Sequence, residues 1–276
     1  MTMASSLDDA RSLVTQVELP KAISSTHPRP RSLEVRSANY TVVESTTEAK
    51  TASILRKLFK LFSVGLKVCF QTSAPMLEHD SGAVLLGPRQ PHSHKKCLVL
   101  DLDETLVHST LKPMDCPDFI VPVSVAGELH HFYVKKRPGV DAFLEYAGNH
   151  FEVVVFTASM PSYASPVIDM LDLTQTVSAR LYRDSCRIVD GDYVKDLDVL
   201  GRPLNETLIV DNSPLSYKTH TANAIGIETW IQREDDAELK RVQTLLELLR
   251  DQHDVRPILL ELRAHELGAD PDFLGK

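Results

Sequence analysis

Residues 97–105 read Cys-Leu-Val-Leu-Asp-Leu-Asp-Glu-Thr, a short apolar run that ends in two aspartates two positions apart. Four consecutive apolar residues bounded by polar ones are typical of a buried strand in a parallel sheet. Two side chains at i and i+2 project to the same side of an extended chain, so Asp101 and Asp103 can reach one crevice. This stretch therefore predicts a strand that delivers two carboxylates to a common site.

The chain beyond this stretch alternates between strand-like and helix-like runs. Further strands are expected at 151–156, 179–182 and 208–210, and helices at 140–146, 163–173 and 237–249, the last of which is expected to close the domain. Two apolar runs at 119–125 and 130–134 lie on either side of Ala126-Gly127 and predict a β-hairpin. This alternation indicates an α/β fold with a doubly wound parallel sheet and a small β-hairpin insertion.

Polar residues follow three of the predicted strands directly. They are Asp101 and Asp103 after the first strand, Thr157 and Ser159 after the second, and Asp211, Asn212 and Ser213 after the third. Ligands of such sheets bind beyond the carboxyl ends of the strands, so these side chains are expected to converge on one site. Oxygen donors of this kind suit Mg²⁺.

The two aspartates fit the needs of phosphate-ester cleavage. Such a reaction requires a nucleophile in line with the leaving oxygen, a proton donor for that oxygen and cations for the phosphoryl oxygens. Asp101 can be the nucleophile and form an aspartyl phosphate. Asp103 can protonate the leaving group and then activate water. Without other motifs, however, an Asp-x-Asp after a strand fits a turn or a helix cap equally well.

Four motifs in the chain resemble the FCP/SCP branch of the haloacid dehalogenase phosphatases. They are VLDLDETLVHS (99–109), VVVFTAS (153–159), YVKDL (193–197) and LIVDNSPLSY (208–217), and HFYVKKRPGV (131–140) extends the likeness. The resemblance is strongest to the small phosphatases that act on the C-terminal domain of RNA polymerase II. It covers about residues 95–260, with the motifs in the same order.

This resemblance implies a role for each matching residue. Asp101 would be the nucleophile and Asp103 the general acid and base, while Thr157 would bind the phosphoryl group. Lys195 would neutralise phosphoryl oxygens and orient Asp101. The implied ligands of Mg²⁺ are the Asp101 carboxylate, the Asp103 backbone carbonyl and Asn212, with Asp211 beside the ion or behind its ligands. Taken alone, Lys195 would be read as a solvated surface charge.

The resemblance also implies two contacts with substrate. Arg183 lies in the segment that lines the family's substrate groove, where it would contact a phosphopeptide; the alternative is a surface salt bridge. Leu111 stands where the polymerase-tail phosphatases carry an aromatic residue in a pocket for a substrate proline. A leucine keeps the pocket apolar but removes ring stacking, so this departure bears on specificity and not on the chemistry. His108 follows the aspartates closely and is expected to pack the loop.

Composition separates the chain into two parts. The net charge of −8 divides into +4 for residues 1–95 and −12 for the remainder, and so acidic a domain does not favour direct nucleic-acid binding. Residues 1–50 are expected to form a disordered arm, 51–94 a basic amphipathic helix with a linker, and 95–276 the phosphatase domain. The four cysteines form no C-x-x-C pair, and the N-terminus lacks the pattern of a secretory signal, so an intracellular protein of the nucleus or cytoplasm is expected.

Residues 54–70 read ILRKLFKLFSVGLKVCF, an apolar stretch interrupted by four cations. The stretch is too charged and slightly too short for a transmembrane helix, but its apolar residues fall on one helical face. One interpretation is a peripheral membrane contact through an interfacial helix, which acylation of Cys69 would strengthen. The other is a helix packed on protein.

Together these observations predict a magnesium-dependent protein serine/threonine phosphatase, with the polymerase tail as one candidate substrate. A membrane-associated phosphatase of another phosphoprotein remains an alternative because of residues 54–70. A catalytically silent binding module of the same fold is a second, although Asp101, Asp103, Lys195 and Asn212 are all intact. A small-metabolite phosphatase fits less well, because the stretch between Ser109 and Phe151 leaves no room for a large cap.

Overall fold

The computed structural model of the chain describes residues 85–89, 93–125 and 127–266. The predicted arm at 1–50 and the basic stretch at 54–70 lie outside the described residues. None of the described helices combines the length and the apolar character needed to cross a bilayer. Residues 85–89 belong to the stretch expected to be a linker, yet Leu86 is buried and the backbone N–H of Leu85 donates to the Val199 carbonyl at 2.7 Å.

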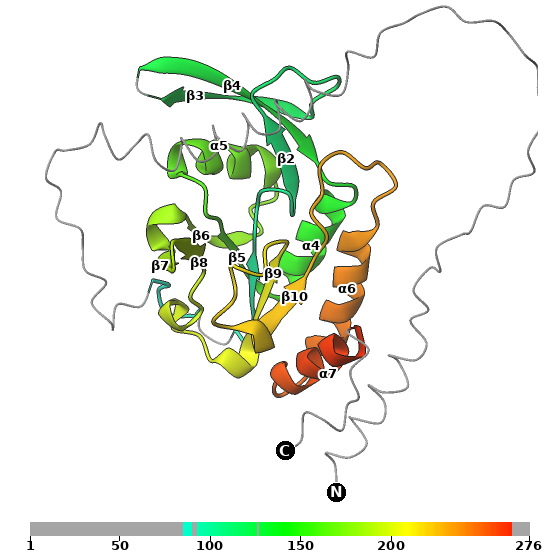
Figure 1. Cartoon of the computed structure of the whole chain (residues 1–276). Helices are drawn as coiled ribbons and strands as arrows, with labels where there is room; N and C mark the ends of the chain where they lie inside the picture. The colour runs from blue at the N-terminus through cyan, green and yellow to red at the C-terminus, as the bar shows by residue number, and fades with distance from the viewer. Residues whose placement is uncertain (1–84, 90–92, 126, 267–276) are drawn as a thin grey trace, which may run out of the picture. The chain divides into compact units, whose positions relative to one another are not determined.

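A five-stranded parallel sheet forms the centre of the molecule (Figure 1). Its strands, in spatial order, are β10 (Ala224–Gly226), β9 (Thr207–Asp211), β1 (Cys97–Leu100), β5 (Glu152–Phe156) and β6 (Val177–Leu181). The chain leaves β1 toward β5 and β6, and later returns to the other side of β1 to form β9. The strand order therefore reverses at β1, which is where ligands bind in sheets of this kind.

The two faces of the sheet are covered differently. Leu98 and Leu100 belong to a large apolar core shared with four helices, α4 (Val140–His150), α5 (Pro161–Leu171), α6 (Glu238–Leu249) and α7 (Arg256–Glu266). Val99 points to the opposite face, because side chains alternate along a strand, and it packs in a second core with Leu197 and Leu200. That second core is covered mainly by loops and short 3₁₀ turns, η1 (Arg183–Ser185), η2 (Asp198–Leu200), η3 (Leu204–Glu206) and η4 (Thr221–Asn223).

Two smaller antiparallel sheets flank the main one. The first contains β2 (Val107–Thr110), β4 (Glu128–Lys136) and β3 (Phe119–Val125), with β4 in the middle, and the second pairs β7 (Arg187–Val189) with β8 (Asp192–Val194). Gly139, at φ 80°, provides the left-handed turn by which the chain passes from β4 into α4. The β3–β4 ribbon stands above the main sheet in Figure 1.

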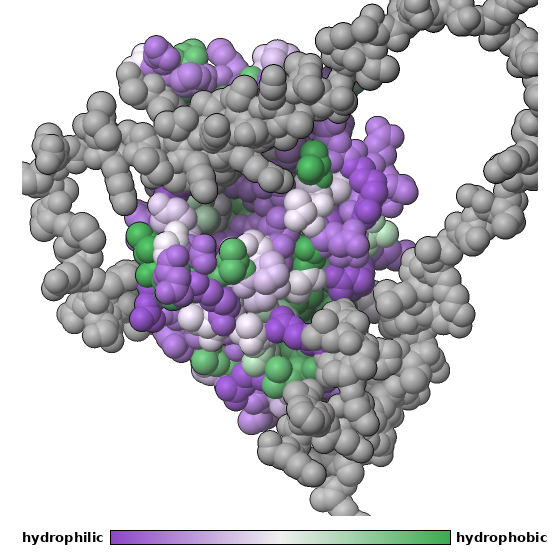
Figure 2. All heavy atoms as spheres, in the orientation of Figure 1, coloured by the Kyte–Doolittle hydropathy of each residue, from purple (hydrophilic) through white to green (hydrophobic). Residues whose placement is uncertain are grey.

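The α/β fold with a parallel sheet and a hairpin insertion is confirmed. The expectation that residues 237–249 close the domain is wrong, because α7 follows and buries Ile258 and Leu259 in the larger core. The short strands β2, β7, β8 and β10 were not predicted. On the face shown in Figure 2 the described surface is mostly hydrophilic, and its hydrophobic residues occur in small separate groups.

Candidate active site

The side chains of the two aspartates after β1 point away from the larger apolar core. Leu102 between them is fully buried in the same core as Leu98 and Leu100, so alternation turns Asp101 and Asp103 in the opposite direction. The backbone N–H of Asp101 still pairs with Val210 of β9 at 3.0 Å. Beyond them the chain turns sharply at Glu104, which has a left-handed φ of 57°. This turn directs the chain into β2, which belongs to a separate sheet.

Lys195 joins the strand ends of β1 and β9. Its Nζ lies 2.5 Å from Asp101 Oδ1 and 2.6 Å from Asp211 Oδ2, and the residue is only 1% exposed. Burial alone would lower the pKa of Lys195, but the two carboxylates outweigh that effect and raise it. Lys195 therefore stays charged and connects the residue after β1 with the last residue of β9.

Asp211 lies in an environment short of positive charge. Its own burial and the nearby Asp101 carboxylate raise the pKa of Asp211 to about 6, against the opposing influence of Lys195. Its second oxygen, Oδ1, accepts the backbone N–H of Ser213 at 2.7 Å. One ammonium thus does not balance the two carboxylates it contacts, and a further cation would stabilise them.

Three hydroxyls surround Asp103, two from the β5–α5 connection and one from the first turn of α5. Oδ2 of Asp103 accepts a hydrogen bond from Ser159 at 2.6 Å and a longer one from Thr157 at 3.4 Å, while Oδ1 accepts from Tyr163 at 2.6 Å. Burial, together with the charge of Glu104, raises the pKa of Asp103 to about 6, although the bonds from Ser159 and Tyr163 pull it down. Asp103 can therefore exchange a proton near neutral pH.

Asn212 closes the site on the β9 side. Its Oδ1 accepts from the Thr105 hydroxyl at 3.4 Å, and its Nδ2 donates to the Thr229 hydroxyl at 3.0 Å. The amide oxygen thus faces the loop that carries the aspartates. With the three carboxylates, it makes a set of hard oxygen donors with an excess of negative charge, which fits a divalent cation such as Mg²⁺.

A buried ion pair that belongs to neither β1 nor β9 contacts the loop after β1. Arg137 donates to both carboxylate oxygens of Asp236, at 2.8 and 2.9 Å, and to the carbonyl of Thr105 at 3.1 Å. The carbonyl of Glu104 accepts the backbone N–H of Trp230 at 2.9 Å. The catalytic loop is therefore attached to two segments that are distant in sequence.

The structure thus brings together Asp101, Asp103, Thr157, Lys195, Asp211 and Asn212, but it leaves the two expected substrate contacts at the margin. Arg183 donates to the Ala158 carbonyl at 2.6 Å and its guanidinium lies 5.1 Å from the centre of the Tyr193 ring. Leu111 lies just beyond β2 and is partly exposed. His108 hydrogen-bonds to Glu104 at 3.1 Å. Tyr163 was not anticipated, and Ser159 had no assigned role.

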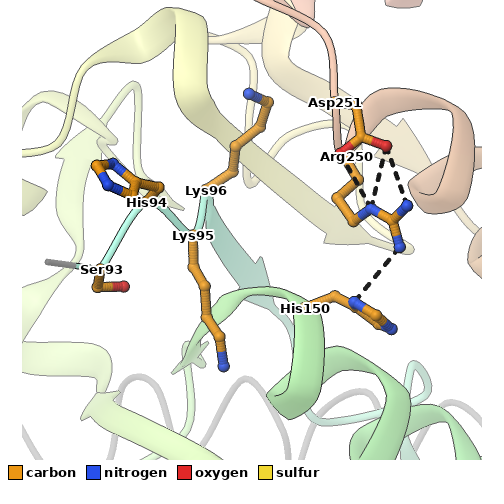
Figure 3. Close-up of a pocket in the computed structure, with 7 residues that line it drawn as sticks. All are labelled: Ser93, His94, Lys95, Lys96, His150, Arg250 and Asp251. Carbon is orange, nitrogen blue, oxygen red and sulfur yellow. Dashed lines mark hydrogen bonds and ion pairs between the residues drawn. The ribbon is translucent and has the colours of Figure 1, made fainter.

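Described residues line a cavity beside β2 and another at the amino edge of the sheet. A cavity of about 420 Å³ runs beside β2 and is lined by His108, Thr110, Lys112, Pro113, Met114, Asp115 and Gln232. A cavity of about 520 Å³ lies at the amino edge of the sheet and is lined by Ser93, His94, Lys95, Lys96, His150, Arg250 and Asp251 (Figure 3). The second is therefore separated from Asp101 by the length of β1.

Two of the cations that line that second cavity contact neighbouring groups. Lys95 donates to the Gly148 carbonyl at 2.7 Å, in the last turn of α4. Arg250, at the end of α6, contacts His150 at 3.4 Å and Asp251 at 3.0 Å, as the dashed lines in Figure 3 mark. Basic groups stabilise the carbonyl-rich ends of helices, so these residues are explained as helix caps.

A third group, Asp196, Asp198 and His220, brings ligand-type atoms within 4.8 Å of one another. The contacts within the group account for it: His220 Nε2 lies 2.8 Å from Asp196 Oδ1, and that oxygen also accepts the backbone N–H of Asp198 at 3.2 Å. None of its three residues hydrogen-bonds to Asp101, Asp103 or Asp211 among the described residues. We therefore place the candidate cation site at the strand ends.

A parallel α/β sheet with carboxylates and a buried lysine at its switch point defines a class of phosphoryl-transfer domain. The family model described as "NLI interacting factor-like phosphatase" matches residues 96–256. The chain belongs to this family of phosphatases, which confirms the resemblance found in its motifs.

Similar proteins carry related names. The chain is 53% identical over 180 residues to a "Probable C-terminal domain small phosphatase" of Dictyostelium discoideum, covering 65% of this chain and 59% of that protein. It is 44% identical over 201 residues to the human "Carboxy-terminal domain RNA polymerase II polypeptide A small phosphatase 1", covering 70% of this chain and 77% of the human one. The chain thus spans about three fifths of the Dictyostelium protein's length.

Among solved structures, "The Structure of Fcp1, an essential RNA polymerase II CTD phosphatase" overlaps with a TM-score of 0.44 and 18% identity. The overlap covers 63% of each chain. So low a score supports no conclusion about fold or activity, both of which rest on the sheet itself and on the family match.

Proposed function

We propose that this chain is a Mg²⁺-dependent protein serine/threonine phosphatase that works through an aspartyl phosphate on Asp101. The main support is the contact of the buried Lys195 ammonium with both Asp101 and Asp211, at 2.5 and 2.6 Å. This arrangement holds the Asp101 carboxylate at the mouth of the crevice and leaves excess negative charge for a metal ion. A structural ion pair would not require a second carboxylate on the same ammonium.

In the first step an oxygen of Asp101 attacks phosphorus, and the bond between phosphorus and the serine or threonine oxygen breaks. The leaving oxygen takes a proton from the Asp103 carboxyl group. In the second step Asp103, now ionised, accepts a proton from the water that attacks phosphorus, the bond from phosphorus to the Asp101 oxygen breaks, and inorganic phosphate leaves. Lys195 and the Thr157 hydroxyl bind phosphoryl oxygens, and Arg183 contacts the substrate chain beyond them.

Mg²⁺ would be held by the Asp101 carboxylate, the Asp103 backbone carbonyl and Asn212, with Asp211 next to it. The ion would neutralise charge on the phosphoryl oxygens during transfer. These residues fit Mg²⁺ for two reasons. They offer oxygen ligands, and Lys195 alone does not balance the charge of the carboxylates around it.

A protein substrate fits the shape of the site's surroundings. The β3–β4 hairpin exposes Ile120 and Leu129, which are 47% and 63% accessible and available to a bound polypeptide. The names of the relatives make the polymerase tail one candidate, and Leu111 in place of an aromatic residue argues for a different preference around the phosphorylated residue. A nuclear or cytoplasmic location belongs to the same proposal.

Two other functions have less support. The membrane-associated alternative depends on residues 54–70, which lie outside the described residues. A silent binding module would have no need of Asp211, whose pKa is raised beside Asp101, since perturbed pKa values of this kind cluster at functional sites.

The test is the release of phosphate from p-nitrophenyl phosphate with Mg²⁺, with a chelator, and in the Asp101→Asn variant. We expect activity only with the metal and the intact aspartate, and full activity of Asp101→Asn would exclude the covalent route. Phosphoserine-proline peptides compared with unrelated phosphopeptides then test the substrate, since equal rates would reject a polymerase-tail preference. Pelleting with anionic liposomes, with and without residues 54–70, tests the membrane alternative.

A further inference from the structure

Tyr163 is the described residue that connects the acid–base group with the hairpin sheet. It lies in the first turn of α5, and its hydroxyl oxygen is 2.6 Å from Asp103 Oδ1 and 2.5 Å from Ser109 Oγ on β2. Its ring packs against Phe132 of β4, with centroids 4.8 Å apart and planes tilted by 48°. The position of the Tyr163 side chain is therefore fixed by hydrogen bonds at its hydroxyl and by packing at its ring.

The Asp103 carboxylate would otherwise turn freely. The terminal torsion of an aspartate is broad, so a single hydrogen bond does not fix the direction of each oxygen. Here Tyr163 contacts Oδ1 at 2.6 Å and Ser159 contacts Oδ2 at 2.6 Å, so each oxygen has its own donor. The carboxyl plane is therefore fixed relative to the end of β1.

We propose that Tyr163 is a positioning residue for general acid catalysis, which holds the Asp103 carboxyl group in line with the leaving oxygen. The inference rests on the proposed function, because it presupposes that Asp103 protonates the leaving oxygen. In that step the bond from phosphorus to the substrate oxygen breaks, the Asp103 proton moves to that oxygen, and Asp103 becomes a carboxylate. Tyr163 itself exchanges no proton with substrate.

The test compares two substrates whose leaving groups differ in how much they depend on protonation by Asp103. A serine alkoxide is a poor leaving group and depends on the proton from Asp103, whereas p-nitrophenolate leaves with little help. The comparison uses kcat/KM, which reports steps up to phosphoryl transfer to Asp101 and excludes hydrolysis of the aspartyl phosphate. Tyr163→Phe removes the hydroxyl and keeps the ring against Phe132.

Tyr146→Phe is the matched control. Tyr146 is also a half-buried tyrosine on a helix, but its hydroxyl has no hydrogen-bond partner among the described residues and its ring contacts His150, far from Asp103. Removing this hydroxyl should change neither substrate's kcat/KM.

For Tyr163→Phe we expect kcat/KM on a phosphoserine peptide to fall by about 10- to 100-fold, within the range of general acid catalysis, and on p-nitrophenyl phosphate by less than about threefold. Ser159→Ala, which removes the other donor, should show the same contrast. Equal losses on both substrates, or no loss in either variant, would overturn the positioning role. If the wild type and Tyr146→Phe cleave neither substrate, it is the proposed function that fails.

Discussion

Both edges of the parallel sheet carry charged groups, but the balance between acidic and basic groups differs between the two edges. At the carboxyl edge, Asp101, Asp103 and Asp211 lie near one another, and Lys195 is the only cation of the described residues that hydrogen-bonds to any of them. At the amino edge charges occur as pairs, such as Arg202 with Glu152 at 2.7 Å. The edges are about 17 Å apart, since Lys96 and Asp101 lie on either side of β1 at about 3.3 Å per residue.

This difference separates the proposed site from a structural arrangement of charges. Ion pairs at the amino edge, such as Arg202 with Glu152, attach loops to the sheet. The carboxylates at the carboxyl edge outnumber the cation that contacts them, so a metal ion would stabilise them. The cavity of about 520 Å³ lies at the amino edge, so the balance of charge indicates the proposed site better than cavity volume does.

The largest effect is expected from Lys195→Met. Two buried carboxylates would lose their shared cation, so the unfolding free energy in chelator should fall by about 3 kcal/mol. Phosphatase activity with Mg²⁺ should fall by about 10³-fold, because a group that stabilises phosphoryl charge is gone. Urea unfolding and phosphate release measure the two effects. Lys195→Arg keeps the charge and should retain most of the stability; an unchanged unfolding free energy in Lys195→Met would contradict the imbalance.

Arg137→Met should be next in size. The variant leaves Asp236 buried without its cation, at a cost of about 3 kcal/mol in unfolding free energy. The Thr105 carbonyl also loses its donor, so kcat should fall more than KM rises, since the catalytic loop and not the substrate groove is loosened. Steady-state kinetics beside urea unfolding measure both effects. A stable variant with wild-type kcat would show that this pair does not support the carboxyl edge.

Glu152→Gln tests the ion pairs of the amino edge through the pH dependence of the unfolding free energy. Its hydrogen bond with Arg202 holds the pKa of Glu152 below the usual 4.5. A carboxyl group with a depressed folded pKa adds stability above the unfolded value, and that stability is lost as the pH falls through the folded one. The wild type should exceed the variant by about 1–2 kcal/mol at pH 7, with the gap closing below pH 4.5. Unfolding curves across this range decide, and a gap independent of pH would refute the pairing.

The smallest effect is expected from Arg250→Ala. The residue is partly exposed and bonds with Asp251 and His150, so the loss of unfolding free energy should be small. Activity should not change at all. Thermal unfolding at low and high salt measures the loss of stability, because salt screening should remove most of the difference between variant and wild type. A clear loss of phosphatase activity would mean that the amino edge contributes to function after all.

The sequence allowed the middle of the fold to be predicted better than its margins. The apolar runs of β1, β5 and β9 are buried on both faces and leave a clear signal, and the polar residues that end them mark the site. The short strand β10 and the polar β2 form because longer neighbours pair with them. Tyr163 was missed for a related reason: its partner Asp103 is 60 residues away, and the contact follows from how α5 packs, which no local pattern records.

The order of the strands has a consequence for synthesis on the ribosome. β1 is made first among the strands of the main sheet, but it lies between β5 and β9, and its β9 side has no partner until Thr207–Asp211 has emerged. Until then a nascent chain exposes an apolar strand edge, which invites aggregation or recognition by chaperones. A chain that stops before β9 also lacks Asp211 and Asn212, so it would lack part of the proposed site.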